Sequence, residues 1–291
     1  MVFKLVVIGL MFYYGVRISI LIKIINVLMS KNIRYDRFLL NYQGNKYQET
    51  KKHLGDFIST SNYDIIAEPF CGIFGFSRAY FELKPDFKGE IWLNDIDEDL
   101  INNLIRLRDE PEKLINEIKE YIEPFENDKS LTKTKDKPYI ISMVYTGLSG
   151  HLMNLKKGNQ KITNHDILKY SNFFKNVKFF NMSSDEFINM VYKIDNKHIL
   201  IYCDPPYFNS NNKGYQKYCS LASKNEYHDG TSLYLDIFKR MKLKKDNIDI
   251  MLIMNKLDII NYTFRDYIFL QYNGLYQNFG KSLKKHIIYL S

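Results

Sequence analysis

Short apolar runs alternate with amphipathic segments from Tyr63 onward. The apolar runs that are short enough for buried strands span 64–67, 90–93, 177–180, 198–203 and 248–254. Apolar residues recur at helical spacing in 76–83, 98–108, 184–191 and 233–241. Strands that alternate with helices predict an α/β fold with a mostly parallel, doubly wound sheet that is covered on both faces. Because such sheets bind ligands beyond the carboxyl ends of their strands, we expect the chemistry to lie just after each strand.

The middle of the chain lacks this alternation. Residues 129–137 are charged and without apolar periodicity, and 156–161 form a second basic, polar stretch, so both are predicted to be loops. Residues 138–155 between them are predicted to be helical. We therefore interpret 110–175 as a mainly helical insertion, which divides the sheet domain into 30–109 and 176–291.

The first 29 residues are mostly apolar, but Arg17 and Lys23 interrupt them. A membrane-spanning helix needs about 20 predominantly apolar residues, so two cations near the middle make this segment a poor span. A signal peptide is not favoured either, because no A-x-A-like cleavage site follows. We expect 1–29 to be a dispensable or misassigned extension before Met29. Membrane contact through 1–29, as an anchor or an interfacial helix, is the alternative.

The net charge bears on the class of partner, and the cysteines bear on metal binding and on the cellular compartment. Lysine and arginine number 41 against 33 acidic residues, a formal charge of +8, which is a weak indication of a polyanionic partner. AT-rich codon usage would raise the lysine content equally well. The three cysteines are widely spaced and contain no C-x-x-C pair, which argues against a zinc site and a disulfide framework. We expect no metal, and a protein that is not secreted and lies in the cytoplasm or wherever its nucleic-acid partner resides.

The strongest chemical motif follows the fourth predicted strand. There the chain reads "ILIYCDPPY", which places Asp204, Pro205, Pro206 and Tyr207 at the strand end. One reaction that this motif would suit is methylation of the exocyclic amine of adenine. This amine is a weak nucleophile, because its lone pair is delocalised into the ring. Asp204 and the carbonyl of Pro205, held by the fixed backbone of two prolines, would supply two acceptors for its hydrogens. An ordinary strand-to-loop stop is the competing interpretation, since Asp and Pro commonly end strands.

Other strand ends also carry candidate residues. Glu68 closes the first strand, and Gly72 and Gly75 would let the following loop approach a ligand, although an ordinary strand–helix turn has the same pattern. Asp95 follows the second strand, where nucleoside-binding sheets place an acid against ribose hydroxyls. Asp97 fits the role of helix N-cap better than Asp95 does, which leaves Asp95 for a ligand.

These motifs together resemble the Dam-like class of DNA adenine methyltransferases. D-P-P-Y matches the catalytic motif of that class, "NYQGNK" its amino-terminal motif, "AEPFCGIFG" its donor loop, and "LNDIDEDLINNL" its acidic segment. The ending "GKSLKKHIIYLS" is similar too, and the resemblance extends over roughly 38–291 with gaps in the middle. The donor-binding residues that the resemblance implies are Tyr42, Lys46, Glu68, Phe70, Gly72, Gly75, Asp95, Asp185 and Asp204. For Asp185, a helix start capped by Ser183 or Ser184 explains the segment equally well.

The resemblance implies a Rossmann-like methyltransferase that uses S-adenosylmethionine to methylate a flipped adenine in double-stranded DNA. Its insertion would be the target-recognition region. The DNA-binding candidates are Tyr145, His151, Asn154, Lys156, Lys157 and Lys161, with Lys213 and Lys217 in the loop after the active site. No arginine occurs between Arg108 and Arg240 to match the arginine-containing hairpin that reads GATC in relatives, so GATC specificity is not predicted.

Two other hypotheses stay open. The family's glycines usually lie closer together than Gly72 and Gly75, because Ile73 and Phe74 intervene here. That difference favours a catalytically inactive DNA-binding module on the same scaffold, which donor binding would distinguish from an enzyme. The same chemistry directed at RNA or at a protein amide is the other alternative.

Overall fold

The computed structural model describes residues 46–123, 173–206, 237, 239, 243, 245–255, 265–278 and 281–290. The chain divides into two compact units, Met1–Phe38 and Leu39–Ser291, and every described residue belongs to the second. The amino-terminal extension and most of the predicted insertion, with its recognition residues, therefore lie outside the described residues. Within the described ranges, no helix is long and apolar enough to cross a membrane.

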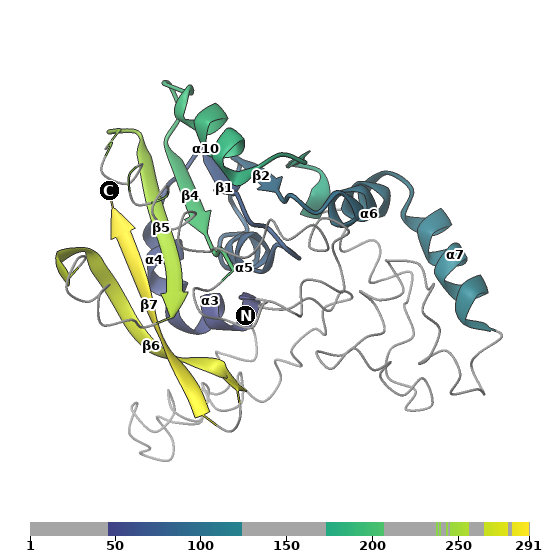
Figure 1. Cartoon of the computed structure of the whole chain (residues 1–291). Coiled ribbons are helices and arrows are strands. Elements are labelled where there is room, and N and C mark those ends of the chain that lie inside the picture. Colours follow the sequence, from purple (N-terminus) through teal and green to yellow (C-terminus); the bar gives the residue numbers. More distant parts are fainter. Residues whose placement is uncertain are drawn as a thin grey trace, which may run out of the picture. The chain divides into compact units, whose positions relative to one another are not determined.

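A single sheet organises the described part of the second unit (Figure 1). Its strand order is β3-β2-β1-β4-β5-β7-β6. The strands are β1 (Ile65–Glu68), β2 (Glu90–Asn94), β3 (Val177–Phe180), β4 (Ile199–Cys203), β5 (Ile248–Asn255), β6 (Ile268–Asn278) and β7 (Lys281–Leu290). Neighbours among β1 to β5 pair in parallel, and β7 runs antiparallel to both β5 and β6. The prediction of a mostly parallel sheet is confirmed.

All five predicted strands form, and their ends differ from the prediction by at most one residue. The reason is burial: every residue of β1 and of β4 is buried, so both strands are continuous apolar runs of the kind that parallel sheets require. The hairpin of β6 and β7 was not predicted. Its strands contain lysine, asparagine and glutamine among the apolar residues, which hides the strand pattern.

The helices that the structure describes are α3 (Tyr47–His53), α4 (Gly55–Thr60), α5 (Gly75–Leu83), α6 (Glu98–Asp109), α7 (Pro111–Ile122) and α10 (Ser184–Tyr192). The predicted helices 76–83, 98–108 and 184–191 correspond to α5, α6 and α10. Of the predicted helix 233–241, only Ile237 and Lys239 are described, and both are helical. α7 begins the predicted insertion with a proline in its first turn, where the missing N–H costs nothing.

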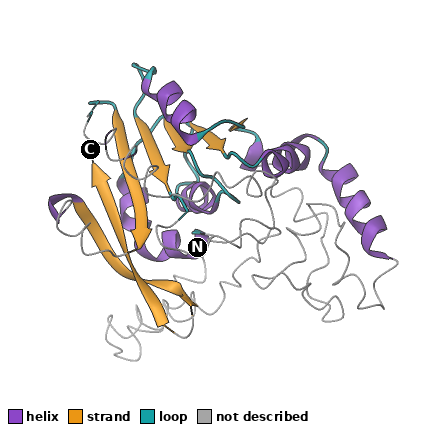
Figure 2. Cartoon of the chain, in the orientation of Figure 1, coloured by secondary structure: helices purple, strands orange, loops and turns teal. Residues whose placement is uncertain are grey.

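The two faces of the sheet are covered by different helices (Figure 2). Phe187 and Val191 of α10 pack on the face that carries Ile199 and Ile201 of β4. Tyr202 alternates to the opposite face, where its ring stacks on Phe76 of α5 with centroids 3.7 Å apart. This two-sided covering buries the centre of the sheet and leaves the carboxyl ends of the strands as the place for chemistry.

Candidate active site

The loop after β1 makes a tight turn through two left-handed residues. Gly72 has a φ of 47° and Phe74 a φ of 46°. Glycine adopts this conformation without steric strain, whereas a bulky residue is strained in it by about 1–3 kcal/mol. Phe74 is fully buried, and its ring packs against Phe173 and Phe174 with centroids 5.2 Å and 5.1 Å away. Aromatic packing therefore holds the turn in the shape that a second glycine would otherwise favour.

Asp95 joins the tip of β2 to this loop. Its Oδ2 accepts a hydrogen bond from the Gly72 N–H at 3.0 Å, and its Oδ1 accepts from the Asp97 N–H at 3.1 Å. Burial raises the pKa of Asp95, whereas these backbone donors lower it. Asp97 itself is the N-cap of α6, since its side chain accepts from the Leu100 N–H. The predicted capping role of Asp97 is thus confirmed. Asp95 was expected to be available for a ligand, but both of its carboxylate oxygens already accept backbone hydrogen bonds.

Asn94, the last residue of β2, connects three strand ends and was missed by the sequence analysis. Its Nδ2 donates to the carbonyls of Pro69 and Met182, both at 3.0 Å, and its Oδ1 accepts from the Met182 N–H at 3.1 Å. Its own carbonyl accepts from the Cys71 N–H at 2.8 Å. Because Asn94 is fully buried, its side-chain amide depends on these bonds for hydrogen-bond partners.

Glu68 ends β1 inside the protein. Its Oε1 accepts from the Ser77 N–H at 2.9 Å, so it satisfies a first-turn donor of α5, whose N-cap residue Phe74 provides no side-chain acceptor. Burial raises the pKa of Glu68 to about 8; the hydrogen bonds from Ser77 oppose this shift, and the negative charge of Asp204 adds to it. Glu68 and Asp204 therefore interact electrostatically across neighbouring strand ends.

Asp204 follows β4 directly and forms an ion pair with Lys46. The Lys46 Nζ lies 2.7 Å from Asp204 Oδ2, and the side chains are 4% and 16% exposed, respectively. Lys46 is the residue before α3, and its carbonyl accepts from the Thr50 N–H at 2.8 Å. Pro205 is buried and Pro206 is half-buried. The structure thus excludes a solvated surface position for Lys46 and brings it to the D-P-P motif.

The remaining predicted residues are placed as follows. Gly75 is the first residue of α5, and Phe70 packs against the apolar core on the α10 side of the sheet. Asp185 is exposed in the first turn of α10 and accepts from Asn189 Nδ2 at 3.2 Å. Ser183 caps that helix in a capping box with Glu186, as one of the two explanations of this segment predicted. The residues outside the described ranges are Tyr42, Tyr207, Tyr145, His151, Asn154, Lys156, Lys157, Lys161, Lys213 and Lys217.

The site collects its groups at the carboxyl ends of three adjacent strands, β2, β1 and β4. Lys46 with Asp204 and Gly72 with Asp95 are the pairs that the structure brings into contact. The described residues contain no cluster of histidine, cysteine or acidic side chains that would hold a metal ion. The arrangement offers carboxylate acceptors and a backbone turn, which suit an organic ligand with hydroxyl or amine donors.

The chain was compared with protein families, with solved structures and with curated proteins. A model of the D12 class N6 adenine-specific DNA methyltransferase family matches residues 42–142 and 145–278. Among solved structures, the delta-N METTL16 MTase domain aligns with a TM-score of 0.42 at 11% identity, over 90% of this chain and 93% of that chain. The structure of PH0851 aligns with a TM-score of 0.37 at 9% identity, over 81% of this chain and 44% of that chain. A search of curated proteins found no match.

The family match runs from the segment before α3 to the end of β6, and it includes every described strand except β7. It contains Lys46, the loop at Gly72, Asp95 and Asp204, which are the residues that the structure gathers at the strand ends. The resemblance seen in the sequence is therefore confirmed. The protein belongs to the D12 class of N6 adenine-specific DNA methyltransferases.

Proposed function

We propose that the protein transfers a methyl group from S-adenosylmethionine to the exocyclic amine of an adenine that has left duplex DNA, and that the tip of β4 holds this amine. The observation that carries the proposal is the Asp204 carboxylate, which lies at the end of a central strand, is partly exposed, and is held by Lys46 at 2.7 Å. A carboxylate fixed in this way is a ready acceptor for a substrate amine.

The chemistry needs two acceptors at the amine nitrogen. Lys46 occupies Asp204 Oδ2, and within the described residues Oδ1 has no partner, so Oδ1 is the oxygen that would accept one amine hydrogen. The Pro205 carbonyl would accept the other, because the proline rings restrict the backbone around it. Both bonds draw electron density onto the nitrogen. As the new N–C bond forms, the methyl–sulfur bond of the donor would break and leave its electron pair on the sulfur. The nitrogen gives up one proton, and Asp204 Oδ1 is the expected acceptor.

The adenine must leave the base stack before these groups can contact its amine. Enzymes that act on a base inside a duplex flip it out, at a cost of a few kcal/mol for unstacking and unpairing. Tyr207 is the expected stacking partner, and a base–aromatic stack is worth about 1–3 kcal/mol. Residues 110–175 would read the surrounding sequence, and the charge of +8 suits the phosphate backbone.

The residues at the strand tips fit the methyl donor. S-adenosylmethionine would supply a methyl group bound to a positively charged sulfur, which makes the methyl carbon electrophilic. The Asp95 oxygens accept backbone N–H groups, and each carboxylate oxygen can accept more than one hydrogen bond, so the two oxygens can also bind the two hydroxyls of a ribose. Gly72 has no side chain to block this approach. We infer that Asp95 organises the loop and binds the donor at the same time.

A catalytically inactive DNA-binding module was the alternative. It depended on the wide spacing between Gly72 and Gly75. Because Phe74, two residues after Gly72, adopts the left-handed conformation, the tight turn forms without a closer second glycine. No described feature favours the inactive alternative, and we prefer the enzyme.

The test is methyl transfer by the purified protein. Unmethylated duplex DNA is incubated with a donor that carries an isotopically labelled methyl group, and the digested nucleosides are analysed by mass spectrometry for labelled N6-methyladenine. Asp204→Ala should retain donor binding by calorimetry while turnover falls by at least about a hundredfold. A variant that methylates at the wild-type rate would show that Asp204 is not the acceptor. Label in RNA or protein instead of DNA would favour the other acceptor classes.

Base flipping has its own readout. A duplex with 2-aminopurine in place of the target adenine should increase in fluorescence when the protein binds, because the base is no longer quenched by stacking. An unchanged signal would contradict the proposal that the base leaves the stack, provided that the protein methylates the same duplex with adenine at that position.

A further inference from the structure

A buried ion pair connects the first turn of α3 to β7, next to the site but outside it. Lys285 Nζ lies 3.0 Å from Glu49 Oε1 and 2.9 Å from Glu49 Oε2, so it contacts both carboxylate oxygens. The side chains of Lys285 and Glu49 are only 8% and 1% exposed. The Tyr272 hydroxyl on β6 adds a third bond, at 3.1 Å to Glu49 Oε2. One carboxylate of α3 thereby binds to both strands of the carboxyl-terminal hairpin.

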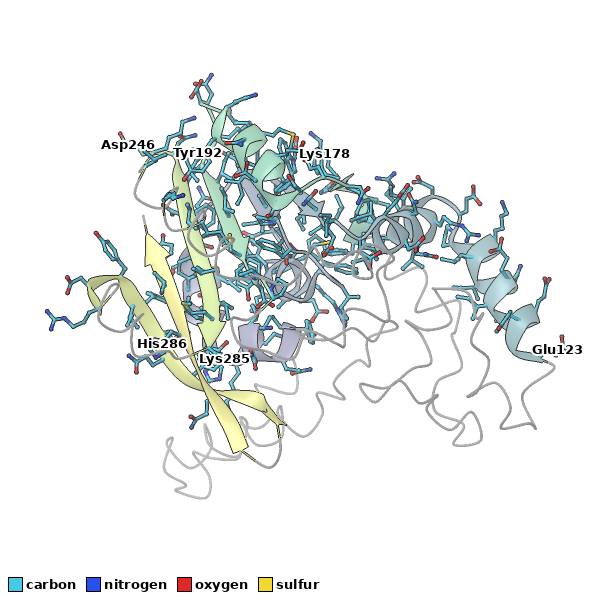
Figure 3. All side chains as sticks on the ribbon, viewed as in Figure 1. Glu123, Lys178, Tyr192, Asp246, Lys285 and His286 are labelled. Atoms are coloured by element: carbon cyan, nitrogen blue, oxygen red, sulfur yellow. The ribbon has the colours of Figure 1, made fainter. Side chains whose placement is uncertain are left out.

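The same hairpin also contacts the other end of α3. The Tyr272 ring stacks on His53, the last residue of the helix, with centroids 4.3 Å apart and an interplanar angle of 27°. Lys285 pairs in register with Asn255, the last residue of β5, which places it at the carboxyl edge of the sheet (Figure 3). Asp204 follows β4 at this edge. The ion pair and the D-P-P motif are therefore neighbours at one edge of the sheet.

Lys46 connects the ion pair to the site. It is the residue immediately before α3, and its carbonyl is bonded to the first turn of the helix, which contains Glu49. Burial lowers the pKa of Lys285, the charge of Lys46 lowers it further, and the charges of Glu49 and Asp204 raise it. The two cations and two anions thus form one electrostatic cluster. A shift of α3 against the hairpin would move the backbone from which Lys46 reaches Asp204.

Stability alone is a weak explanation for this pair. Removing two charges from water costs several kcal/mol per ion, and well-packed apolar residues often replace a buried ion pair without loss of stability. An ion pair restricts geometry in a way that apolar packing does not. A cation that contacts both carboxylate oxygens permits few relative positions of the two backbones. Catalytic geometry is sensitive to displacements of about 1 Å, so such a constraint beside an active site has a functional consequence.

We propose that Glu49, Lys285 and Tyr272 are positioning residues, which fix the start of α3 against the β6–β7 hairpin and thereby place Lys46 opposite Asp204. This inference rests on the proposed methyl-transfer function for its kinetic consequence. Its structural part, the dependence of the Lys46–Asp204 contact on the Glu49–Lys285 pair, is independent of activity. The two parts are therefore tested separately.

The structural test is a double-mutant cycle on the full chain. The coupling between Lys46 and Asp204 is measured from the urea midpoints of wild type, Lys46→Met, Asp204→Asn and the double variant. The cycle is then repeated in the background Glu49→Met with Lys285→Met, which replaces the buried ion pair by apolar side chains. We expect the coupling present in the wild type to be lost in this background. Unchanged coupling would overturn the inference, whether or not the protein methylates DNA.

The kinetic test compares Lys285→Met with Lys285→Arg. The methionine variant should lower kcat by about ten- to a hundredfold with little change in the KM for DNA, because the misplaced Lys46 affects the reacting groups more than DNA contact. The arginine variant keeps a cation that can contact both oxygens and should recover most of kcat. Equal activity in both variants and wild type would leave the pair without a positioning role.

Asp249→Asn is the matched control. Asp249 is also buried and accepts hydrogen bonds from Tyr63 and Tyr289 at 2.6 Å and 2.8 Å, but it pairs with Leu200 near the start of β4, at the opposite edge of the sheet. The Asp249→Asn variant should be less stable than wild type, while the Lys46–Asp204 coupling and kcat stay unchanged.

Tyr272→Phe is the alternative if the background with Glu49→Met and Lys285→Met does not fold. This variant removes only the hydroxyl that bonds to Glu49, and coupling equal to wild type in it would contradict the inference.

Discussion

Lys46 Nζ lies 2.7 Å from Asp204 Oδ2, so the residue before α3 contacts the residue after β4. Lys46 is almost completely buried, whereas Asp204 retains some exposure, which is the asymmetry expected when one partner supports and the other meets a substrate. Within the described residues, the contact leaves the other carboxylate oxygen of Asp204 available for a donor from the substrate. We therefore predict that turnover depends on Lys46.

Lys46→Met should lower both stability and turnover. The substitution leaves Asp204 without its cation, and because Asp204 is partly exposed we expect a loss of about 1–3 kcal/mol in the free energy of unfolding, less than for a fully buried pair. The carboxylate also loses its fixed orientation, so kcat should fall by at least about tenfold. Urea denaturation and single-turnover methylation measure the two effects.

Lys51→Met is the control for this change. Lys51 belongs to the same helix and pairs with Glu82 at 3.2 Å, with both side chains more than a quarter exposed. The Lys51→Met substitution should lower the free energy of unfolding by at most about 1 kcal/mol and leave kcat unchanged. If Lys46→Met behaves like Lys51→Met in the methylation assay, the contact with Asp204 has no part in turnover.

Gly72→Ala should weaken donor binding. Alanine at a φ of 47° costs about 1–2 kcal/mol, and the strain acts on the N–H that bonds to Asp95. We expect the dissociation constant for S-adenosylmethionine, measured by calorimetry, to rise several-fold. Gly55→Ala provides the comparison, since it begins α4 and a methyl group there meets no atom within 4 Å. A Gly72→Ala protein with wild-type donor affinity would show that this loop does not contribute to donor binding.

Asn94→Ala should destabilise the three strand ends together. The change removes one buried hydrogen bond to Pro69 and two partly buried ones to Met182 and leaves their backbone groups unsatisfied, so we expect a loss of about 1–3 kcal/mol in the free energy of unfolding. Asn103→Ala removes an exposed side-chain bond on α6 and should change stability by less than about 0.5 kcal/mol. Equal urea midpoints for the two variants would show that Asn94 does not connect the strands energetically.

The sequence predicted the central sheet well for a physical reason. Strands buried on both faces are continuous apolar runs, and the parallel order brings the residues after them to one edge. For this reason the apolar pattern alone was enough to assign Asp95 and Asp204 to the carboxyl ends of strands in one sheet. The helical spacing likewise identified α6, with Asp97 as its N-cap.

The rest depends on contacts between distant parts of the chain. No local pattern shows that Glu49 pairs with Lys285, because each looks like a surface charge until α3 and β7 come together. The left-handed conformation of Phe74 depends on the rings of Phe173 and Phe174, which lie far along the chain. Asn94 ends a strand in the sequence, and its three side-chain hydrogen bonds form only when β1 and β3 lie on either side of β2.

Glu68→Gln should change how stability depends on pH. Burial raises the pKa of Glu68 from 4.5 to about 8 in the folded protein. Between these two values the folded state keeps a proton that the unfolded chain has released, so the folded state loses stability relative to the unfolded state as pH rises through this window. Glutamine carries no titratable proton and still offers an oxygen to the Ser77 N–H.

The urea midpoint of the wild type, taken relative to the variant, should therefore fall from about pH 4.5 to about pH 8 and stay level outside that range. Groups that titrate in both proteins cancel in this difference. Asp56→Asn, which removes an exposed acid of α4, controls for the change of net charge. Parallel wild-type and Glu68→Gln curves would mean that the pKa of Glu68 is the same in the folded and unfolded states. Glu68 would then be ionised in the folded protein above about pH 4.5, and its charge would act on Asp204 throughout that range.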